Sequence, residues 1–108
     1  QPAFTRFNVF LRDGFKCAYC GSHEDLTFDH LIPCSKGGRT SWDNIVAACS
    51  PCNLRKGGRL AHDIGMHPSH RPHRPTTFQL QEMGRKFPPN HLHGTWLDYL
   101  YWDVELDT

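Results

Sequence analysis

The chain has 108 residues, of which nine are glycine and eight are proline. A chain of this length forms one small domain with a limited hydrophobic core, so we expect an additional brace such as a bound metal ion. No apolar run approaches the roughly 20 residues that cross a membrane, and nothing at the start resembles a signal peptide. We therefore expect a cytoplasmic protein without a membrane partner.

The formal net charge of +1 conceals an uneven distribution of charge. Residues 33–86 contain nine Lys or Arg and three acidic residues, whereas residues 90–108 contain four acidic residues and no Lys or Arg. A basic middle segment suits a polyanionic partner, because each neutralised phosphate releases bound counterions. An ordinary solvated surface explains the charge equally well, so the charge supports a nucleic-acid partner only in combination with a site.

The first predicted element is a short amphipathic helix over residues 4–12, which ends at Asp13-Gly14. Its buried face carries Phe4, Phe7, Phe10 and Leu11. Residues 25–32 predict a strand on which Asp29 and His30 point to opposite faces. Residues 44–48 predict a second strand, after a loop over residues 33–43 that is rich in Gly and Ser.

The pattern changes to helical at Ser50-Pro51, because serine is a frequent N-cap and proline is favoured at the first helical position. Gly57-Gly58 ends this helix. The three prolines of residues 67–75 predict an irregular connector. Thr76 or Thr77 is expected to cap a helix that runs to about Phe87, and Thr95 a last, aromatic helix that forms core or a dimer face. The order of elements predicts an α+β fold.

Two pairs of cysteines form the strongest local signal, Cys17-x-x-Cys20 and Cys49-x-x-Cys52. A spacing of two residues lets both sulfurs of a pair reach one zinc ion at about 2.3 Å. The 28 residues between the pairs suffice for a hairpin that leaves the metal and returns. We therefore expect a structural zinc site with four thiolates, which leaves no open position for a substrate.

Two disulfides or a redox-active dithiol are the alternatives to zinc. The total of five cysteines is odd and the chain has the character of a cytosolic protein, which argues against disulfides. Two dithiol pairs on either side of a hairpin fit a redox role poorly. Cys34 is left over, and we expect it to be a free thiol.

A second candidate site combines Asp29, His30 and Asn53. If zinc joins the two cysteine turns, the start of the second helix lies near the hairpin and Asn53 can face Asp29. A carboxylate and an amide oxygen are ligands that suit Mg²⁺ or Mn²⁺. Each residue also has an ordinary structural explanation, as a turn carboxylate, a packed histidine or a helix-start residue, so the combination carries the prediction.

The string CAYCG…LTFDHLIPCSKGGRTSWDNIVAACSPCNLRKG resembles the zinc-containing branch of the HNH endonucleases, over about residues 4–66. The resemblance implies the small ββα-metal fold (His-Me finger) with a four-cysteine structural zinc, an N-terminal helix and a short helical C-terminal extension. It places the nuclease domain in residues 1–66. A proline-rich connector and an aromatic helical extension that packs on the same domain then fill residues 67–108.

The resemblance also implies the chemistry of the site. Asp29 and Asn53 bind the catalytic divalent metal, His30 activates water, and Asn44 steadies the loop that orients His30. Hydrolysis of DNA then leaves 5′-phosphate and 3′-hydroxyl ends. This chain has Asn53 where other members of the family have histidine. The basic residues expected to bind phosphate are Lys56, Arg55, Lys36 and Arg39.

Two other functions are compatible with the sequence. One is a catalytically silent, zinc-stapled module that binds nucleic acid, and the other is an interaction domain that uses the aromatic C-terminal third. The substrate could also be RNA, and the protein a monomer or a homodimer. Among the remaining histidines, His62 lies nearest the second helix and is the one that could add a metal ligand.

Overall fold

The computed structural model describes residues 2–87 and residue 106. In chain order its elements are α1 (Arg6–Arg12), β1 (Leu26–His30), the 3₁₀ helix η1 (Cys34–Lys36), β2 (Ile45–Cys49), α2 (Ser50–Lys56), the 3₁₀ helix η2 (Ala61–Ile64) and α3 (Thr77–Lys86). The predicted α+β class and the predicted order of helix, hairpin and helix are confirmed. The helix expected after Thr95 lies outside the described residues.

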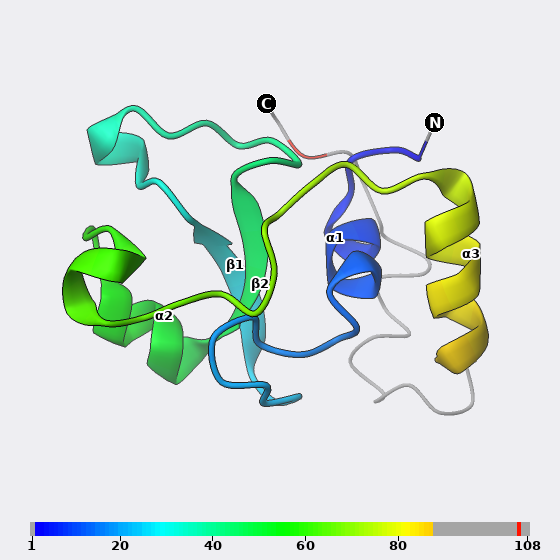
Figure 1. The fold of residues 1–108 in the computed structure, drawn as a ribbon, viewed down its shortest axis with the longest axis horizontal. Coiled ribbons are helices and arrows are strands. Elements are labelled where there is room, and N and C mark those ends of the chain that lie inside the picture. Colours follow the sequence, from blue (N-terminus) through cyan, green and yellow to red (C-terminus); the bar gives the residue numbers. More distant parts are fainter. Residues whose placement is uncertain (1, 88–105, 107–108) are drawn as a thin grey trace.

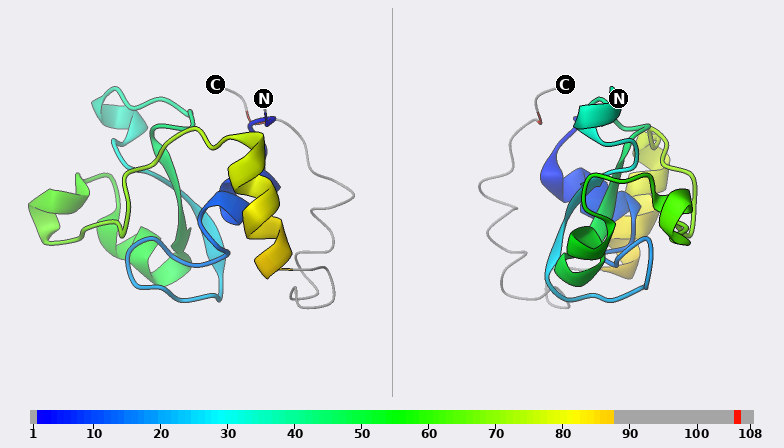
Figure 2. Two further views of the ribbon diagram at one scale, coloured as in Figure 1. Left: turned by 45° about the vertical axis from the view of Figure 1, so that its right-hand side comes forward. Right: turned by 90° about the vertical axis from the view of Figure 1, so that its left-hand side faces the viewer.

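Strands β1 and β2 form an antiparallel hairpin at the centre of the molecule, with Asp29 opposite Val46 and His30 opposite Ile45. Helix α2 lies on one side of the hairpin, and α1 and then α3 lie on the other (Figures 1 and 2). All five residues of β2 are buried, because both faces of this strand are covered. None of the described helices has the length and apolar character needed to span a membrane.

The aromatic face of α1 packs on the hairpin as its periodicity predicts. Thr5 caps the helix by accepting a hydrogen bond from the Asn8 amide at 3.1 Å. Phe10 is fully buried and stacks on Phe28 of β1, with ring centroids 5.0 Å apart. Burial of such a side chain contributes about 1.5–3 kcal/mol, so this contact fixes β1 against α1.

A buried ion pair after α1 connects three parts of the chain. Arg12 and Asp13 lie 2.8 Å apart, and Asp13 also accepts hydrogen bonds from the Ala47 amide and from His70 of the proline-rich connector. Burial alone raises the pKa of Asp13, but the hydrogen bonds from His70 and Arg12 and the charge of Arg12 outweigh it and lower the pKa. The connector is irregular, as predicted, yet His70 ties it to the core.

Helix α2 begins one residue earlier than expected. Cys49 is its N-cap and Ser50 is its first residue, because the Ser50 hydroxyl donates to the carbonyl of Asp25 and does not cap the helix. The helix ends at Gly57, whose φ of 57° favours glycine. Helix α3 agrees with its prediction, since Thr76 forms a reciprocal capping box with Gln79.

Candidate active site

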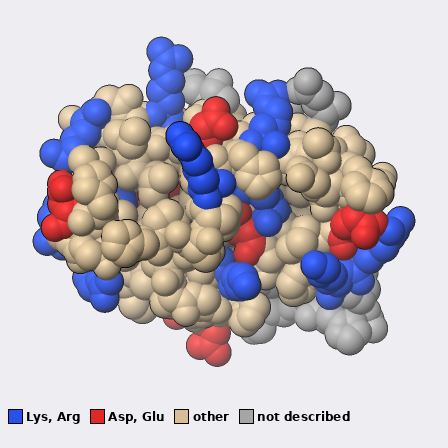
Figure 3. Space-filling view, viewed as in Figure 1, with Lys and Arg blue, Asp and Glu red and all other residues tan. Residues whose placement is uncertain are grey.

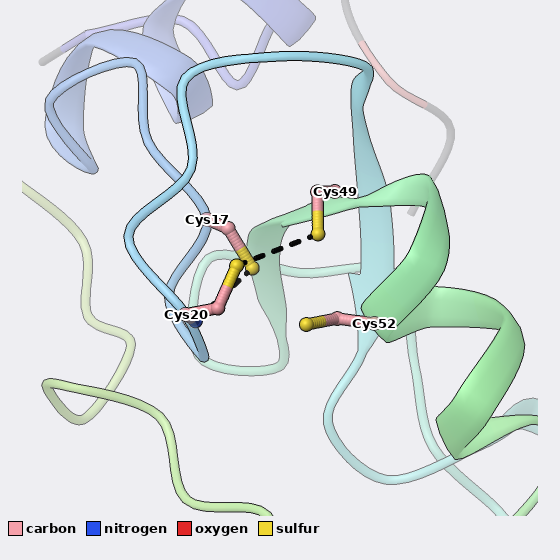
Figure 4. Close-up of side chains that lie close together, drawn as sticks. All are labelled: Cys17, Cys20, Cys49 and Cys52. Carbon is pink, nitrogen blue, oxygen red and sulfur yellow. Dashed lines mark hydrogen bonds between the residues drawn. The ribbon is translucent and has the colours of Figure 1, made fainter.

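The four paired cysteines meet in one cluster, in which all four sulfur atoms lie within 4.8 Å of one another. Cys17 and Cys20 come from the turn after α1, and Cys49 and Cys52 come from the end of β2 and the first turn of α2 (Figure 4). The Sγ atoms of Cys20 and Cys49 are 3.6 Å apart. This arrangement positions four thiolates for one zinc ion, as the spacing of the pairs predicts.

The cysteines of the cluster are free thiols, as is the exposed Cys34 outside it. Burial raises the pKa of Cys17, but backbone amides outweigh this effect and bring the pKa down to about 7. Burial and the neighbouring thiols raise the pKa of Cys52. The pKa of Cys49 is also raised, mainly by burial. Four thiolates packed so closely would repel one another, and a cation bound between them would offset their charge.

Next to the cluster lies an open cavity of about 310 Å³ that joins the ends of β1 and α2. Its lining includes the predicted site residues Asp29, His30, Asn53 and Lys56. Asp29 and His30 follow each other on β1, and both reach the cavity because His30 is the last residue of the strand. The structure thus brings together the carboxylate, the imidazole and the amide.

Asp29 is buried and has a partner on each oxygen. Its Oδ2 accepts a hydrogen bond of 2.5 Å from the hydroxyl of Tyr19, one of the two residues between the first pair of cysteines. Its Oδ1 lies 3.3 Å from the Lys56 ammonium. Burial and the hydrogen bond to Asp29 raise the pKa of Tyr19, so the phenol stays a donor. The carboxylate is therefore held in one orientation.

Lys56 is fully buried on the last turn of α2. Its ammonium donates to the carbonyl of His30 at 2.8 Å as well as to Asp29. Helical periodicity places Lys56 on the same face of α2 as Asn53. A lysine that binds phosphate is expected to face solvent, whereas the ammonium of Lys56 is bonded within the protein. An ammonium has three donors, and these two contacts use two of them.

Asn53 lies on the first half of α2 and is partly buried. Its amide nitrogen donates to the carbonyl of Phe28 in β1 at 2.8 Å. This bond orients the side chain across the hairpin, so the amide oxygen is the atom that Asn53 can offer to a cation. With Asp29 it supplies hard oxygen donors in one cavity, the donor chemistry that fits Mg²⁺ or Mn²⁺.

His30 is held by a residue of the loop that connects the strands. Its Nε2 lies 2.8 Å from the hydroxyl of Thr40. The buried Asn44 accepts from the Ile32 amide and donates to the carbonyls of Ile32 and Arg39. Asn44 therefore closes the loop next to Thr40, and it acts on His30 through the loop backbone, as a positioning residue.

Gly38 is needed by the same loop because the protein itself fills the space next to it. A Cβ on Gly38 would lie 1.7 Å from the carbonyl oxygen of Ile32 and 2.9 Å from Nδ2 of Asn44. The space next to Gly38 is thus filled by the protein itself, so the glycine closes the loop.

The other basic candidates are exposed around this end of the molecule. Lys36 lies on η1, Arg39 follows in the loop, and Arg55 lies on the outer face of α2. Lys and Arg side chains are spread over the whole face of the molecule in Figure 3, several of them at the end that carries α2 and η1. His62 is exposed and pairs with Asp63, and it does not line the cavity of Asp29.

Tyr19 and Thr40 are the site residues that reasoning from the sequence missed. Tyr19 stands in the zinc-binding turn, where attention goes to the cysteines, and Thr40 lies in a loop without periodicity. The sequence could have predicted only that such partners exist, because a buried carboxylate and an oriented imidazole each need a hydrogen-bonding partner.

Part of the chain is similar to known proteins. A family model described as HNH endonuclease matches residues 17–69, the stretch from the first zinc-binding cysteine to the connector. The chain is also 38% identical over 58 residues to "CRISPR-associated endonuclease Cas9" of Corynebacterium diphtheriae. That alignment covers 48% of this chain and 5% of the relative, so the chain spans a small part of that protein. No solved structure matches the chain. Residues 17–69 thus match the HNH endonuclease family.

Proposed function

We propose that this protein is a metal-dependent endonuclease that hydrolyses phosphodiester bonds of DNA. The observation that carries the proposal is the cavity lined jointly by Asp29, His30 and Asn53, next to a cluster of four cysteines. A carboxylate, an imidazole and an amide from two elements line one open cavity. Together they suit the hydrolysis of a phosphate ester.

Asp29 and Asn53 would hold one Mg²⁺ or Mn²⁺ ion through their oxygen atoms. When bound, such an ion stabilises the negative charge that develops on the phosphate and the leaving oxygen. The zinc site is separate, because its four thiolates leave no open coordination position. Its role would be to join the turn after α1 to the end of β2 and the first turn of α2, which keeps Asn53 near Asp29.

His30 is the general base of the proposed reaction. In the tautomer in which Nε2 donates to the Thr40 hydroxyl, Nδ1 of His30 is unprotonated and can take a proton from water. The oxygen of that water bonds to phosphorus while the bond from phosphorus to the 3′ oxygen breaks. The 3′ oxygen leaves with the electron pair and gains a proton from solvent. The products have 5′-phosphate and 3′-hydroxyl ends.

The exposed Lys36, Arg39 and Arg55 would contact phosphates on either side of the cleaved bond. Lys56 is fully buried, so its part in the proposed site is structural: its ammonium holds the Asp29 carboxylate and the carbonyl of His30. Contacts to the backbone carry little sequence information, so we expect weak sequence preference.

A plasmid-nicking assay tests the proposal. The protein should convert supercoiled DNA to nicked circles in Mg²⁺ or Mn²⁺, and DNA ligase should reseal the nicks, because ligase requires 5′-phosphate and 3′-hydroxyl ends. His30→Ala should abolish nicking, whereas the control His62→Ala, at an exposed histidine outside the cavity, should not. Equal nicking by wild type and His30→Ala would overturn the proposal.

The competing function is a silent zinc-stapled module that binds nucleic acid. It would be favoured if the wild-type protein retards DNA in a gel but cleaves neither DNA nor a labelled RNA in either metal. Cleavage of RNA alone would keep the chemistry and change the substrate.

A further inference from the structure

Tyr19 touches both metal sites of the protein. Its backbone amide lies 3.4 Å from the sulfur of Cys17, the first ligand of the zinc cluster, and points its hydrogen at it. Its hydroxyl donates to Oδ2 of Asp29 at 2.5 Å. The same residue is thus anchored by its main chain in the zinc-binding turn and by its side chain on the carboxylate of the cavity.

The two oxygens of Asp29 are held unequally. Tyr19 makes a short bond to Oδ2, whereas Lys56 lies 3.3 Å from Oδ1 and makes its shorter bond, of 2.8 Å, to the carbonyl of His30. Charge-assisted hydrogen bonds from an ammonium usually measure about 2.7–2.9 Å, so the Oδ1 contact is a loose one. Oδ1 is consequently the less firmly held oxygen of Asp29, and a cation that binds it takes the place of the Lys56 contact.

We propose that Tyr19 is a positioning residue that couples the zinc site to the catalytic-metal site. By occupying Oδ2 it fixes the carboxylate so that Asp29 offers one oxygen, Oδ1, to the divalent ion. The place of the phenol depends in turn on the turn between Cys17 and Cys20, which zinc holds closed. The inference rests on the proposed function, since it assigns a divalent ion to Asp29.

Two quantitative consequences follow. Partners that orient a metal-binding side chain typically change metal affinity about 10- to 100-fold, so loss of the hydroxyl should weaken divalent-metal binding by that factor. Coupling between two binding sites is reciprocal. If bound zinc raises the affinity of the cavity for a divalent ion by a given factor, that ion should raise the affinity of the cysteine cluster for zinc by the same factor.

The experiment compares Tyr19→Phe with the matched control Ser22→Ala. Both variants lose one hydroxyl, and Ser22 lies two residues after Cys20, but the Ser22 hydroxyl accepts from the amide of Glu24 and does not contact Asp29. The affinity for Mn²⁺ is measured by calorimetric titration without substrate, and zinc content by elemental analysis. We expect Tyr19→Phe to keep its zinc and bind Mn²⁺ about 10- to 100-fold more weakly. Ser22→Ala should match the wild type.

A second measurement isolates the coupling. Apparent zinc affinity is determined by competition with a zinc-selective chelator, with and without saturating Mg²⁺. Mg²⁺ should strengthen zinc binding in the wild type, and this effect should shrink in Tyr19→Phe. If Tyr19→Phe binds Mn²⁺ as tightly as the wild type, the proposed positioning role of Tyr19 is overturned. The nuclease proposal still stands in that case if the wild type nicks DNA. If the wild type binds no Mn²⁺, both are overturned.

Discussion

The buried ammonium of Lys56 lies 3.3 Å from the buried carboxylate of Asp29 and thereby ties the last turn of α2 to β1. Both side chains are almost completely shielded, with 0% and 5% of their surface exposed. Ion pairs on the surface contribute little to stability, whereas removing one partner of a buried pair leaves an uncompensated charge. The packing of α2 on β1 next to the cavity therefore depends on this ion pair.

Lys56→Met should destabilise the protein by about 3–5 kcal/mol, because it leaves the Asp29 carboxylate buried without its cation. Urea unfolding measures the loss. The double variant Asp29→Asn, Lys56→Met should lose less stability than the sum of the two single variants, since neither charge is then left unpaired. Arg55→Ala, on the exposed side of the same helix, is the control and should change stability by less than about 0.5 kcal/mol. Additive effects would contradict the ion pair.

Thr40→Val should slow DNA nicking about tenfold at saturating substrate, with little change in KM. The substitution removes the partner of His30 Nε2 but keeps the shape of the side chain. A hydrogen bond to a catalytic group is worth about 1.5 kcal/mol, which corresponds to about tenfold in rate. Single-turnover nicking provides the measurement. Thr40→Ser retains the hydroxyl and should recover most of the rate, so a slow Thr40→Ser would point to packing and not to the hydrogen bond.

Gly38→Ala should impair nicking while zinc stays bound. The added Cβ would overlap the Ile32 carbonyl, which is backbone and cannot move aside as a flexible side chain would. The loop that carries Thr40 must then shift away from His30. Gly84→Ala in α3 is the matched control, because its Cβ would meet nothing within 4 Å and alanine favours a helix by about 0.5–1 kcal/mol. Full activity of Gly38→Ala would show that loop closure does not orient His30.

Much of this fold could be predicted from the sequence, because its signals are local. The periodicity of α1, the capping threonine of α3 and the spacing of the cysteine pairs each depend on residues close together in the chain. The partners of the site residues could not be predicted in this way. The hydrogen bond between Thr40 and His30 depends on how the loop folds back on the strand. The bond between Tyr19 and Asp29 depends in the same way on the turn between Cys17 and Cys20.

The same distinction explains Lys56. Helical periodicity placed it one turn after Asn53, but its burial depends on the carbonyl of His30 and the carboxylate of Asp29, which come from β1. The η2 helix was not expected, because a single 3₁₀ turn has no periodicity to detect.

Cys52→Ser should lose zinc and with it much of the stability of the fold. Three thiols and a hydroxyl make a much poorer site, and the binding energy of a structural zinc is part of the folding energy of a small domain. Elemental analysis should give one zinc per wild-type chain, and thermal unfolding should shift to lower temperature in the variant. Cys34→Ser is the matched control, because Cys34 is exposed and lies outside the cluster. Loss of zinc from Cys34→Ser would contradict the four-cysteine assignment.

Acid should destabilise the protein through Asp13. Because its pKa in the folded protein lies below the ordinary value of 3.8, the carboxylate contributes stability above that pH. This contribution is lost as the pH falls through the lowered pKa, when the buried group takes up a proton and its bonds to Arg12 and His70 weaken. Urea unfolding across this range measures the effect. Asp13→Asn should be less stable at pH 7 and should show a flatter dependence below about pH 4. Asp63→Asn, at an exposed carboxylate, should behave as the wild type. If the acid sensitivity of Asp13→Asn equals that of the wild type, other carboxylates control acid unfolding. The contacts of the Arg12–Asp13 pair with the connector would then not stabilise the protein as proposed.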